Sequence, residues 1–259
     1  MFNLLHKIEA NITDARVLGP GFVARHLKPW ADRHRFRYAG RPVTFRRRGG
    51  CDTQIIRYLL IDGEYRFLPA AEDVVRANYE KILKAGKTPV IVDAGGNIGM
   101  TAIWLAHAYP KATVVSIEPD PANFAILEEN ASHWPNVIPL RAALGGEPGR
   151  VDMSDGESWA IQTTRSDEGD TPIITIRQAA ARAGDDAQLL IVKIDIEGFE
   201  LDVFDGDTSW LDDIACLMIE PHDWLRPQEH TSRSFQREVG RRAFNLYIQQ
   251  ANLIYVRNA

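Results

Sequence analysis

From residue 88 onward the chain alternates short apolar runs with helical stretches, and this rhythm limits its fold more than any other feature. Five runs are predicted to form strands: Pro89–Val92, Thr113–Ile117, Val137–Leu140, Leu189–Ile194 and Ile214–Ile219. Helices are predicted between several of them, including Ile98–His107 and Pro121–Ser132. Strands of continuous Val, Ile and Leu are typical of a parallel sheet that is covered on both faces. The pattern therefore predicts a doubly wound α/β domain.

An antiparallel hairpin is predicted near the C-terminus, where Leu246–Ile248 and Leu253–Val256 are separated by a short polar link. Such a hairpin adds two antiparallel strands to the edge of the parallel sheet. We therefore assign residues 70–259 to a core domain with a mostly parallel, seven-stranded sheet.

Residues 1–69 are predicted to form a basic N-terminal α+β extension, with helical pieces broken at Gly19–Gly21 and β-rich stretches over residues 36–45 and 55–61. Residues 1–50 hold 11 Lys/Arg and 3 Asp/Glu, although the whole chain has a net charge of −5. A basic segment of this kind attracts anionic partners or pairs with acidic groups of the same chain. Because aromatic residues are not systematically interleaved with the basic ones, we favour pairing over nucleic-acid binding. The run Arg46–Arg48 leads directly into the β-rich stretch before the core, so we expect a substrate-facing lid rather than a nucleic-acid arm.

Composition narrows the class of protein further. The chain is 45% hydrophobic and 25% charged, which is ordinary for a globular protein. Its two cysteines, Cys51 and Cys216, exclude a disulfide-rich scaffold and a cysteine-based zinc cluster. No apolar run approaches the roughly 18 residues of a membrane span, and the start lacks the apolar core of a signal peptide. We expect a cytoplasmic protein without a membrane span, and its oligomeric state stays open.

A glycine-rich turn follows the first predicted strand of the core, in the run Val90-Ile91-Val92-Asp93-Ala94-Gly95-Gly96-Asn97-Ile98-Gly99. Glycine lets the backbone approach a ligand closely. The next strand ends at Glu118, a position from which a carboxylate accepts hydrogen bonds from ribose hydroxyls in doubly wound folds. The expected cofactor-binding residues are Asp93, Gly95, Gly96, Asn97, Gly99 and Glu118.

Three kinds of ligand can bind at a glycine turn of this type: phosphates, nicotinamide or flavin cofactors, and S-adenosylmethionine. A phosphate-binding loop needs the pattern G-x-x-x-x-G-K-[ST], and its lysine is absent here. A nicotinamide or flavin site needs G-x-G-x-x-G, which these glycines do not match. A carboxylate from Asp93 at the mouth of the turn would repel a pyrophosphate but suits a ligand that carries ammonium and sulfonium groups. We therefore favour S-adenosylmethionine over a nicotinamide cofactor.

Charged residues gather at the ends of the last two predicted parallel strands. Lys193, Asp195 and Glu197 alternate, so they share one face. Buried charges are costly unless they are paired, which places these residues at the carboxyl edge of the sheet, where ligands bind. Glu220 and His222 follow the next strand in the same way. If these two strands are neighbours in the sheet, the acids and the histidine converge beside the cofactor, and we expect Asp195 to contact it as well. The alternative is structural: Glu197 only begins a helix and Lys193 only neutralises Asp195.

The order of these motifs resembles that of the class I S-adenosylmethionine-dependent methyltransferases. More narrowly, Lys193–Glu200 resembles the K-I-D-x-E-G-x-E hallmark of the FkbM family, and Ile219–His222 is similar to its E-x-H strand ending. Asp62–Tyr65 resembles the stretch that precedes the core of that family. The glycine turn departs from the D-x-G-A-N-x-G pattern of the family at Gly96.

The resemblance covers about residues 45–256 and implies a class I methyltransferase fold with S-adenosylmethionine as cofactor. It also implies an acceptor hydroxyl on a sugar, a glycan or a polyketide-like metabolite. Transfer to oxygen is favoured independently, because the chain lacks an Asn-Pro-Pro-Tyr motif for base nitrogens and a Pro-Cys dipeptide for pyrimidine carbons. Two alternatives stay open: an RNA methyltransferase that uses the basic extension, and a non-catalytic S-adenosylmethionine- or nucleotide-binding module.

Methyl transfer to a hydroxyl requires removal of its proton, since a neutral alcohol attacks a methyl sulfonium poorly. Asp195, Glu197 or His222 can act as the general base, and we predict catalytic roles for these three residues. In the alternative mechanism, the carboxylates and the imidazole hold a divalent metal ion that acidifies the hydroxyl. From the sequence we favour a metal-free base.

Overall fold

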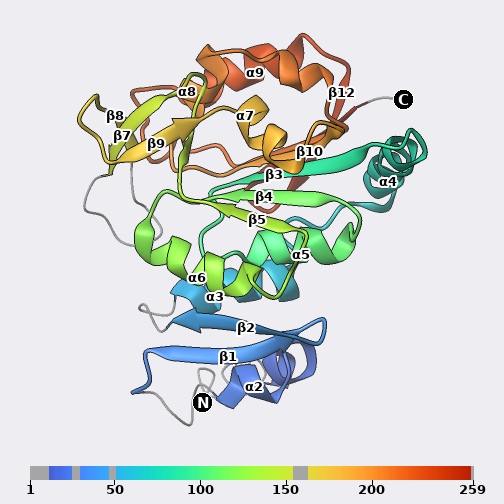
Figure 1. Cartoon of the computed structure of the whole chain (residues 1–259), viewed down its shortest axis with the longest axis vertical. Helices are drawn as coiled ribbons and strands as arrows, with labels where there is room; N and C mark the ends of the chain where they lie inside the picture. Colours follow the sequence, from blue (N-terminus) through green and yellow to red (C-terminus); the bar gives the residue numbers. More distant parts are fainter. Residues whose placement is uncertain (1–11, 25–29, 47–50, 154–162, 258–259) are drawn as a thin grey trace.

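The structure is a computed structural model that describes residues 12–24, 30–46, 51–153 and 163–257 (Figure 1). Its centre is a seven-stranded sheet in the order β12 (Phe244–Gln249), β13 (Asn252–Arg257), β11 (Cys216–Ile219), β10 (Ala187–Ile194), β3 (Thr88–Ala94), β4 (Thr113–Ile117) and β5 (Val137–Leu140). The strands from β11 to β5 are parallel, and β13 pairs antiparallel with both β11 and β12. This confirms the predicted α/β fold with its C-terminal hairpin.

Helices cover both faces of this sheet (Figure 1). One face carries α4 (Pro69–Lys84), α5 (Met100–Ala108) and α6 (Pro121–Ala131), and the other carries α7 (Ile176–Ala180), α8 (Glu200–Asp205) and α9 (Ser232–Gly240). Along β3, Ile91 packs into the hydrophobic cluster of the first face, whereas Val90 and Val92 pack into that of the second. Burial on both faces explains why the strands read as continuous apolar runs, and their predicted bounds agree with the structure within two residues.

The N-terminal extension packs against α6. It contains a helical stretch over residues 12–17, α2 (Pro20–Val23) and an antiparallel hairpin of β1 (Arg33–Tyr38) and β2 (Arg41–Arg46). Arg33 and Arg35 form ion pairs with Glu129 of α6, and the Arg41 guanidinium lies 4.3 Å from the centroid of the Trp134 ring. These described arginines therefore contact the core domain, while the predicted basic residues Arg47 and Arg48 lie outside the described residues.

The expected β-rich stretch over residues 55–61 is helical in the structure, so this part of the prediction is wrong. The segment forms α3 (Cys51–Arg57) and a wider, π-type turn, η2 (Tyr58–Asp62), which ends at Gly63 in a left-handed conformation with φ of 71°. Ile56 and Leu59 are buried in the hydrophobic cluster of the first sheet face. The β-propensity of these residues describes a fit to a half-buried surface, and here a helix provides that fit.

A second, four-stranded sheet lies beside the core and was not predicted. Its order is β6 (Ala143–Leu144), β9 (Thr171–Ile174), β7 (Gly149–Met153) and β8 (Thr163–Arg165). Two short 3-10 turns, η3 (Ala181–Ala183) and η4 (Ser209–Asp212), complete the described elements. Within the described ranges, no helix has the length and apolar character needed to cross a membrane.

Candidate functional site

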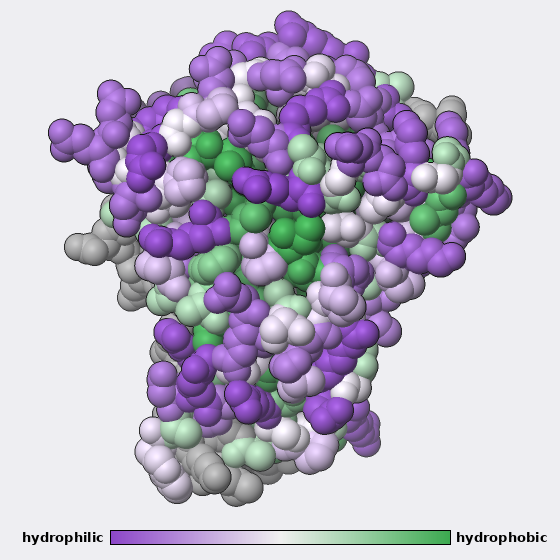
Figure 2. Space-filling view, viewed as in Figure 1, coloured by the Kyte–Doolittle hydropathy of each residue, from purple (hydrophilic) through white to green (hydrophobic). Residues whose placement is uncertain are grey.

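A cavity of about 270 Å³ opens at the carboxyl ends of β3, β4, β10 and β11. This volume lies near the lower end of the range for small-molecule sites, about 300–1,000 Å³. Its wall combines the glycine turn with Glu118, Asp195, Glu197 and Glu220 from the core domain, and with Ile55, Tyr58, Leu59, Glu64 and Tyr65 from the extension. Figure 2 shows apolar residues gathered in the middle of one face of the molecule, between more polar surfaces.

The glycine turn is held by hydrogen bonds to β4 and leaves no room for side chains. The backbone N–H groups of Gly95 and Gly96 both donate to the Ile117 carbonyl, at 3.0 and 2.8 Å. A Cβ at Gly95 would overlap the Asp195 carbonyl oxygen, and one at Gly96 would overlap Ser116 Oγ. Gly95 also has a φ of +77°, which disfavours any side chain. Glycine at these two positions is therefore a requirement of the backbone packing.

Asp93 does not lie at the mouth of the turn, where the sequence placed it, and it does not line the cavity. Its side chain is fully buried, accepts a hydrogen bond from Ser116 Oγ at 2.8 Å and lies 3.4 Å from Lys193 Nζ. Burial raises the pKa of this carboxyl, and the Lys193 ammonium opposes the rise. Lys193 Nζ in turn donates to the carbonyl oxygens of Ala94 and Gly95, at 3.0 and 2.9 Å. In the structure Asp93 anchors the lysine that holds the turn.

Glu118 links the glycine turn to the start of α6. Its Oε2 accepts from the Asn97 backbone N–H at 2.7 Å, and its Oε1 accepts from the Asp120 backbone N–H at 3.0 Å. Burial raises the pKa of Glu118 to about 7, although these hydrogen bonds oppose the rise. Asn97, which lines the cavity with a φ of +48°, has a buried Oδ1 without a hydrogen-bond partner among the described residues. This oxygen is therefore an unsatisfied acceptor on a residue of the cavity wall.

The raised pKa of Glu118 predicts a pH-dependent stability of the ligand-free protein. Between pH 4.5 and about 7 the folded state holds a proton on Glu118 that the unfolded state releases, so stability is lost as pH rises through this window. The difference between the folded and unfolded pKa of Glu118 corresponds to a loss of about 3 kcal/mol at most in the free energy of unfolding. In urea unfolding, we expect Glu118→Gln to gain stability relative to wild type between pH 5 and pH 8.

The matched control for this measurement is Glu80→Gln, which changes an exposed glutamate on α4. Its stability difference from wild type should stay constant over the same pH range. Parallel pH curves for Glu118→Gln and wild type would contradict the prediction.

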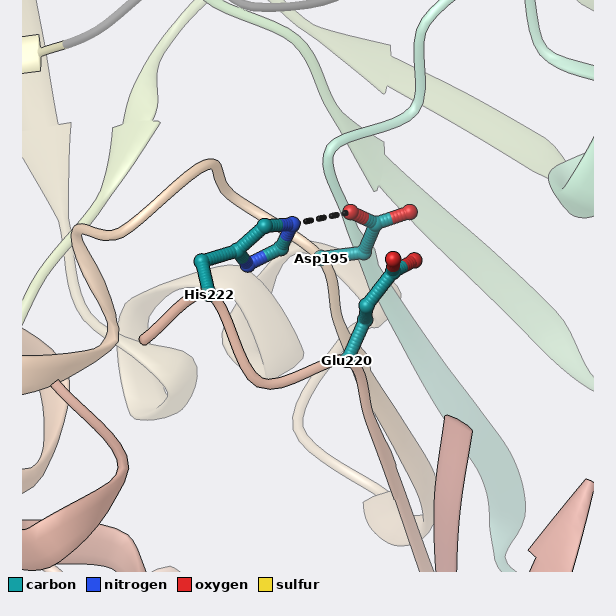
Figure 3. A group of neighbouring side chains, drawn as sticks. All are labelled: Asp195, Glu220 and His222. Carbon is teal, nitrogen blue, oxygen red and sulfur yellow. Dashed lines mark ion pairs between the residues drawn. The ribbon is translucent and has the colours of Figure 1, made fainter. Parts of the chain in front are cut away.

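The acids and the histidine after β10 and β11 converge as expected (Figure 3). His222 is buried, and its Nε2 lies 3.6 Å from Asp195 Oδ1 and 3.5 Å from Glu197 Oε2. On the other side of the ring, Nδ1 is hydrogen-bonded to Glu200 Oε1 at 2.8 Å. Ligand atoms of Asp195, Glu220 and His222 all lie within 4.8 Å of one another. We call Asp195, Glu197, Glu220 and His222 the acid–histidine cluster.

The backbone at Glu197 is in an unusual conformation. Glu197 has a φ of +54°, in the left-handed region that few non-glycine residues occupy, and Gly198 follows with a φ of +95°. A non-glycine residue in this region costs about 1–3 kcal/mol, and such residues cluster at active sites. The strained turn directs the Glu197 side chain into the cavity wall, which argues against a role limited to beginning α8.

Proton affinities in this cluster differ from those of free side chains. Burial lowers the pKa of His222, but the hydrogen bond to Glu200 and the nearby carboxylates together raise it to about 9. Burial and the neighbouring Asp195 raise the pKa of Glu197 to about 8 and that of Glu220 to about 7. A base must be deprotonated to act, and as pH rises Glu220 and Glu197 lose their protons before His222 does.

Three residues to which the sequence assigned no catalytic or binding role support the cluster. Tyr65 donates its hydroxyl proton to Asp195 Oδ2 at 3.2 Å, and burial raises the pKa of this phenol well above its usual value. Glu64 lines the same wall, and Glu200 fixes the imidazole of His222. Tyr65 and Glu64 belong to the Asp62–Tyr65 stretch. The resemblance of this stretch to the family was the sequence signal that could have identified them. The cavity wall contributed by the extension is apolar and acidic, whereas Arg33 and Arg35 of the extension pair with Glu129 of α6.

Comparisons with known proteins point to one family. The sequence profile described as "Methyltransferase FkbM domain" matches residues 93–242. The "Hexuronic acid methyltransferase AglP" of Haloferax volcanii is 33% identical over 169 residues, which are 64% of this chain and 68% of AglP. The "Methyltransferase 1" of Beauveria bassiana is 30% identical over 149 residues, 46% of this chain and 59% of that protein. A crystal structure of methyltransferase FkbM from Methylobacillus flagellatus aligns with a TM-score of 0.43 and 15% identity, over 65% of this chain and 43% of that one.

Proposed function

Because this chain belongs to the FkbM methyltransferase domain family, we propose that it transfers a methyl group from S-adenosylmethionine to a hydroxyl of a sugar, with a sugar acid as the preferred acceptor. The observation that carries this proposal is the position of the acid–histidine cluster in the same cavity as the glycine turn. The named activity of AglP on hexuronic acid supports the choice of a sugar acid over a polyketide-like acceptor.

The residues of the glycine turn fit S-adenosylmethionine. Asn97 Oδ1 is the open acceptor for the ammonium group, and Glu118 has lone pairs left for the ribose hydroxyls. Gly95 and Gly96 line the cavity without side chains, so a ligand there can approach their backbone closely. When bound, the cofactor supplies an electrophilic methyl group on sulfur.

The acid–histidine cluster supplies the proton chemistry. Glu197 lines the cavity and is the proposed acceptor of the hydroxyl proton. Asp195 is held from one side by Lys193 Nζ at 3.5 Å and by Tyr65, so its second oxygen points toward His222. These fixed charges orient an acceptor hydroxyl, and α3 and η2 contribute Ile55, Tyr58 and Leu59 to the cavity wall.

The first test of this function is cofactor binding by isothermal titration calorimetry. We expect wild type to bind S-adenosylmethionine and Glu118→Ala to bind it about 1–3 kcal/mol more weakly, because charge-assisted hydrogen bonds to the ribose are lost. Glu80→Ala serves as the surface control. Unchanged affinity in Glu118→Ala, or tight binding of NAD by wild type, would remove the proposal.

The second test identifies the acceptor with methyl-labelled S-adenosylmethionine. Separate reactions contain uronic acid glycosides, neutral glycosides, polyketide alcohols and RNA, and the products are analysed by mass spectrometry. We expect an alkali-stable methyl ether on the uronic acid glycosides. An alkali-labile product would be a methyl ester and would refute transfer to a hydroxyl, while label in RNA alone would favour the RNA methyltransferase alternative.

A further inference from the structure

The imidazole of His222 is fixed at one nitrogen and faces two carboxylates at ion-pair distance with the other. The side chain is buried, and Glu200 holds it through Nδ1 at 2.8 Å. The opposite nitrogen, Nε2, points into the acid–histidine cluster (Figure 3). Its contacts there, 3.6 Å to Asp195 Oδ1 and 3.5 Å to Glu197 Oε2, are longer than hydrogen bonds, which span about 2.7–3.2 Å. Among the described residues, no hydrogen-bond partner satisfies this nitrogen.

A second side chain of the cluster is oriented in the same way. Asp195 uses Oδ2 for Tyr65 and Lys193, at 3.2 and 3.5 Å, which leaves Oδ1 facing Nε2. Metal-binding histidines are typically held by a carboxylate at their other nitrogen, and metal-binding carboxylates are typically hydrogen-bonded on their far side. Both features are present here, on residues from two different loops.

The spacing of the ligand atoms matches a single small cation. Atoms that bind one cation at about 2.0–2.4 Å lie at most about 4.8 Å from one another. The ligand atoms of Asp195, Glu220 and His222 fall within 4.8 Å. One imidazole with two carboxylates suits Mn²⁺ or another first-row divalent ion better than it suits Ca²⁺, which prefers oxygen ligands alone.

We propose that Asp195, Glu220 and His222 bind one divalent cation, of the Mn²⁺ class, at the edge of the cofactor cavity. Its role rests on the proposed function: the cation binds the acceptor hydroxyl and polarises its O–H bond. The hydroxyl proton passes to Glu197, the hydroxyl oxygen forms a bond to the methyl carbon, and the carbon–sulfur bond breaks to leave a neutral thioether. This proposal replaces the metal-free base favoured from the sequence.

The test measures Mn²⁺ binding to the full chain by electron paramagnetic resonance of free Mn²⁺, at pH 8 and without cofactor or acceptor. We expect one bound ion per chain in wild type. Glu220→Gln and His222→Gln should each weaken binding by at least tenfold, and Glu200→Gln should weaken it by about 10–100-fold because the imidazole loses its support. Glu80→Gln is the matched control, because it removes an exposed acid on α4 and leaves the cavity wall unchanged.

Circular dichroism establishes that each variant is folded. Glu220 is only half-buried, so Glu220→Gln keeps the test decisive if His222→Gln fails to fold. Absence of Mn²⁺ binding in wild type, or equal binding by wild type and Glu220→Gln, would overturn the proposal.

Methyl transfer in the presence of a chelator separates this proposal from the proposed function. Full transfer to a sugar with EDTA present would refute the cation and leave the function standing. Tight Mn²⁺ binding that depends on Glu220, together with no transfer to any sugar, would refute the function and leave the cation site standing. Loss of transfer with EDTA and its recovery with Mn²⁺ would support both.

Discussion

Replacing Lys193 with methionine is expected to destabilise the fold by about 3–5 kcal/mol, because a buried carboxylate loses its only close cation among the described residues. The Lys193 ammonium is almost fully buried and lies 3.4 Å from Asp93 and 3.5 Å from Asp195. Methionine fills a similar volume, so the loss comes from the charge and from two hydrogen bonds to the turn. Urea unfolding at pH 7.5 measures the effect.

The double variant Lys193→Met/Asp93→Asn separates charge from packing. Neutralising Asp93 removes the uncompensated buried charge, so we expect the double variant to recover a substantial part of the lost stability. Equal stability of Lys193→Met and wild type would show that this lysine does not hold the turn, and no recovery in the double variant would show that packing dominates.

Replacing His222 with glutamine is expected to lower the turnover of methyl transfer by about 10²–10⁴-fold while leaving the affinity for S-adenosylmethionine nearly unchanged. The imidazole lies between Glu200 and the cavity acids, and its loss removes the group that organises proton removal. The proposed cofactor contacts come from the glycine turn and Glu118. Among the described residues, no hydrogen bond joins either of them to His222.

Steady-state kinetics with the acceptor that the labelling experiment identifies measures turnover. Calorimetry of cofactor binding measures the affinity for S-adenosylmethionine. His230→Gln is the matched control, because it changes an exposed histidine eight residues further along the same loop region. Near-wild-type turnover of His222→Gln would make this histidine structural and would leave Asp195 or Glu197 as the essential group.

Much of the core domain was predictable because its signals are local. The continuous apolar runs that formed β3, β4 and β10 report burial on both sheet faces, and a parallel sheet brings the carboxyl ends of its strands to one edge. For that reason, the strand exits placed Asp195, Glu197 and His222 at one edge of the sheet. That they meet also required the two strands to be neighbours, which the family resemblance implied. Gly95 was also predictable, since a strand-to-helix turn with close backbone contact requires it.

Other features were not predictable because they depend on partners far away in the chain. The β-branched residues Ile55 and Ile56 are helical because they lie in α3, which packs beside the core. Tyr65 has a role in the site because it contacts Asp195, which lies 130 residues later in the chain. Asp93 has the same local sequence context whether it faces a ligand or a lysine. Only the neighbouring strand β10, which brings Lys193 to it, decided between the two.

The sequence by itself determined where the parallel strands lie in the chain, the glycine turn, and which acids and histidine follow the strands. These features depend on side-chain periodicity and backbone sterics over a few residues. The tertiary structure decided which atoms face one another: Asp93 toward Lys193, Nδ1 of His222 toward Glu200, and Nε2 toward the cavity acids. Proton affinity and metal affinity both depend on burial and on charges within a few ångströms, and those distances exist only after the strands have packed.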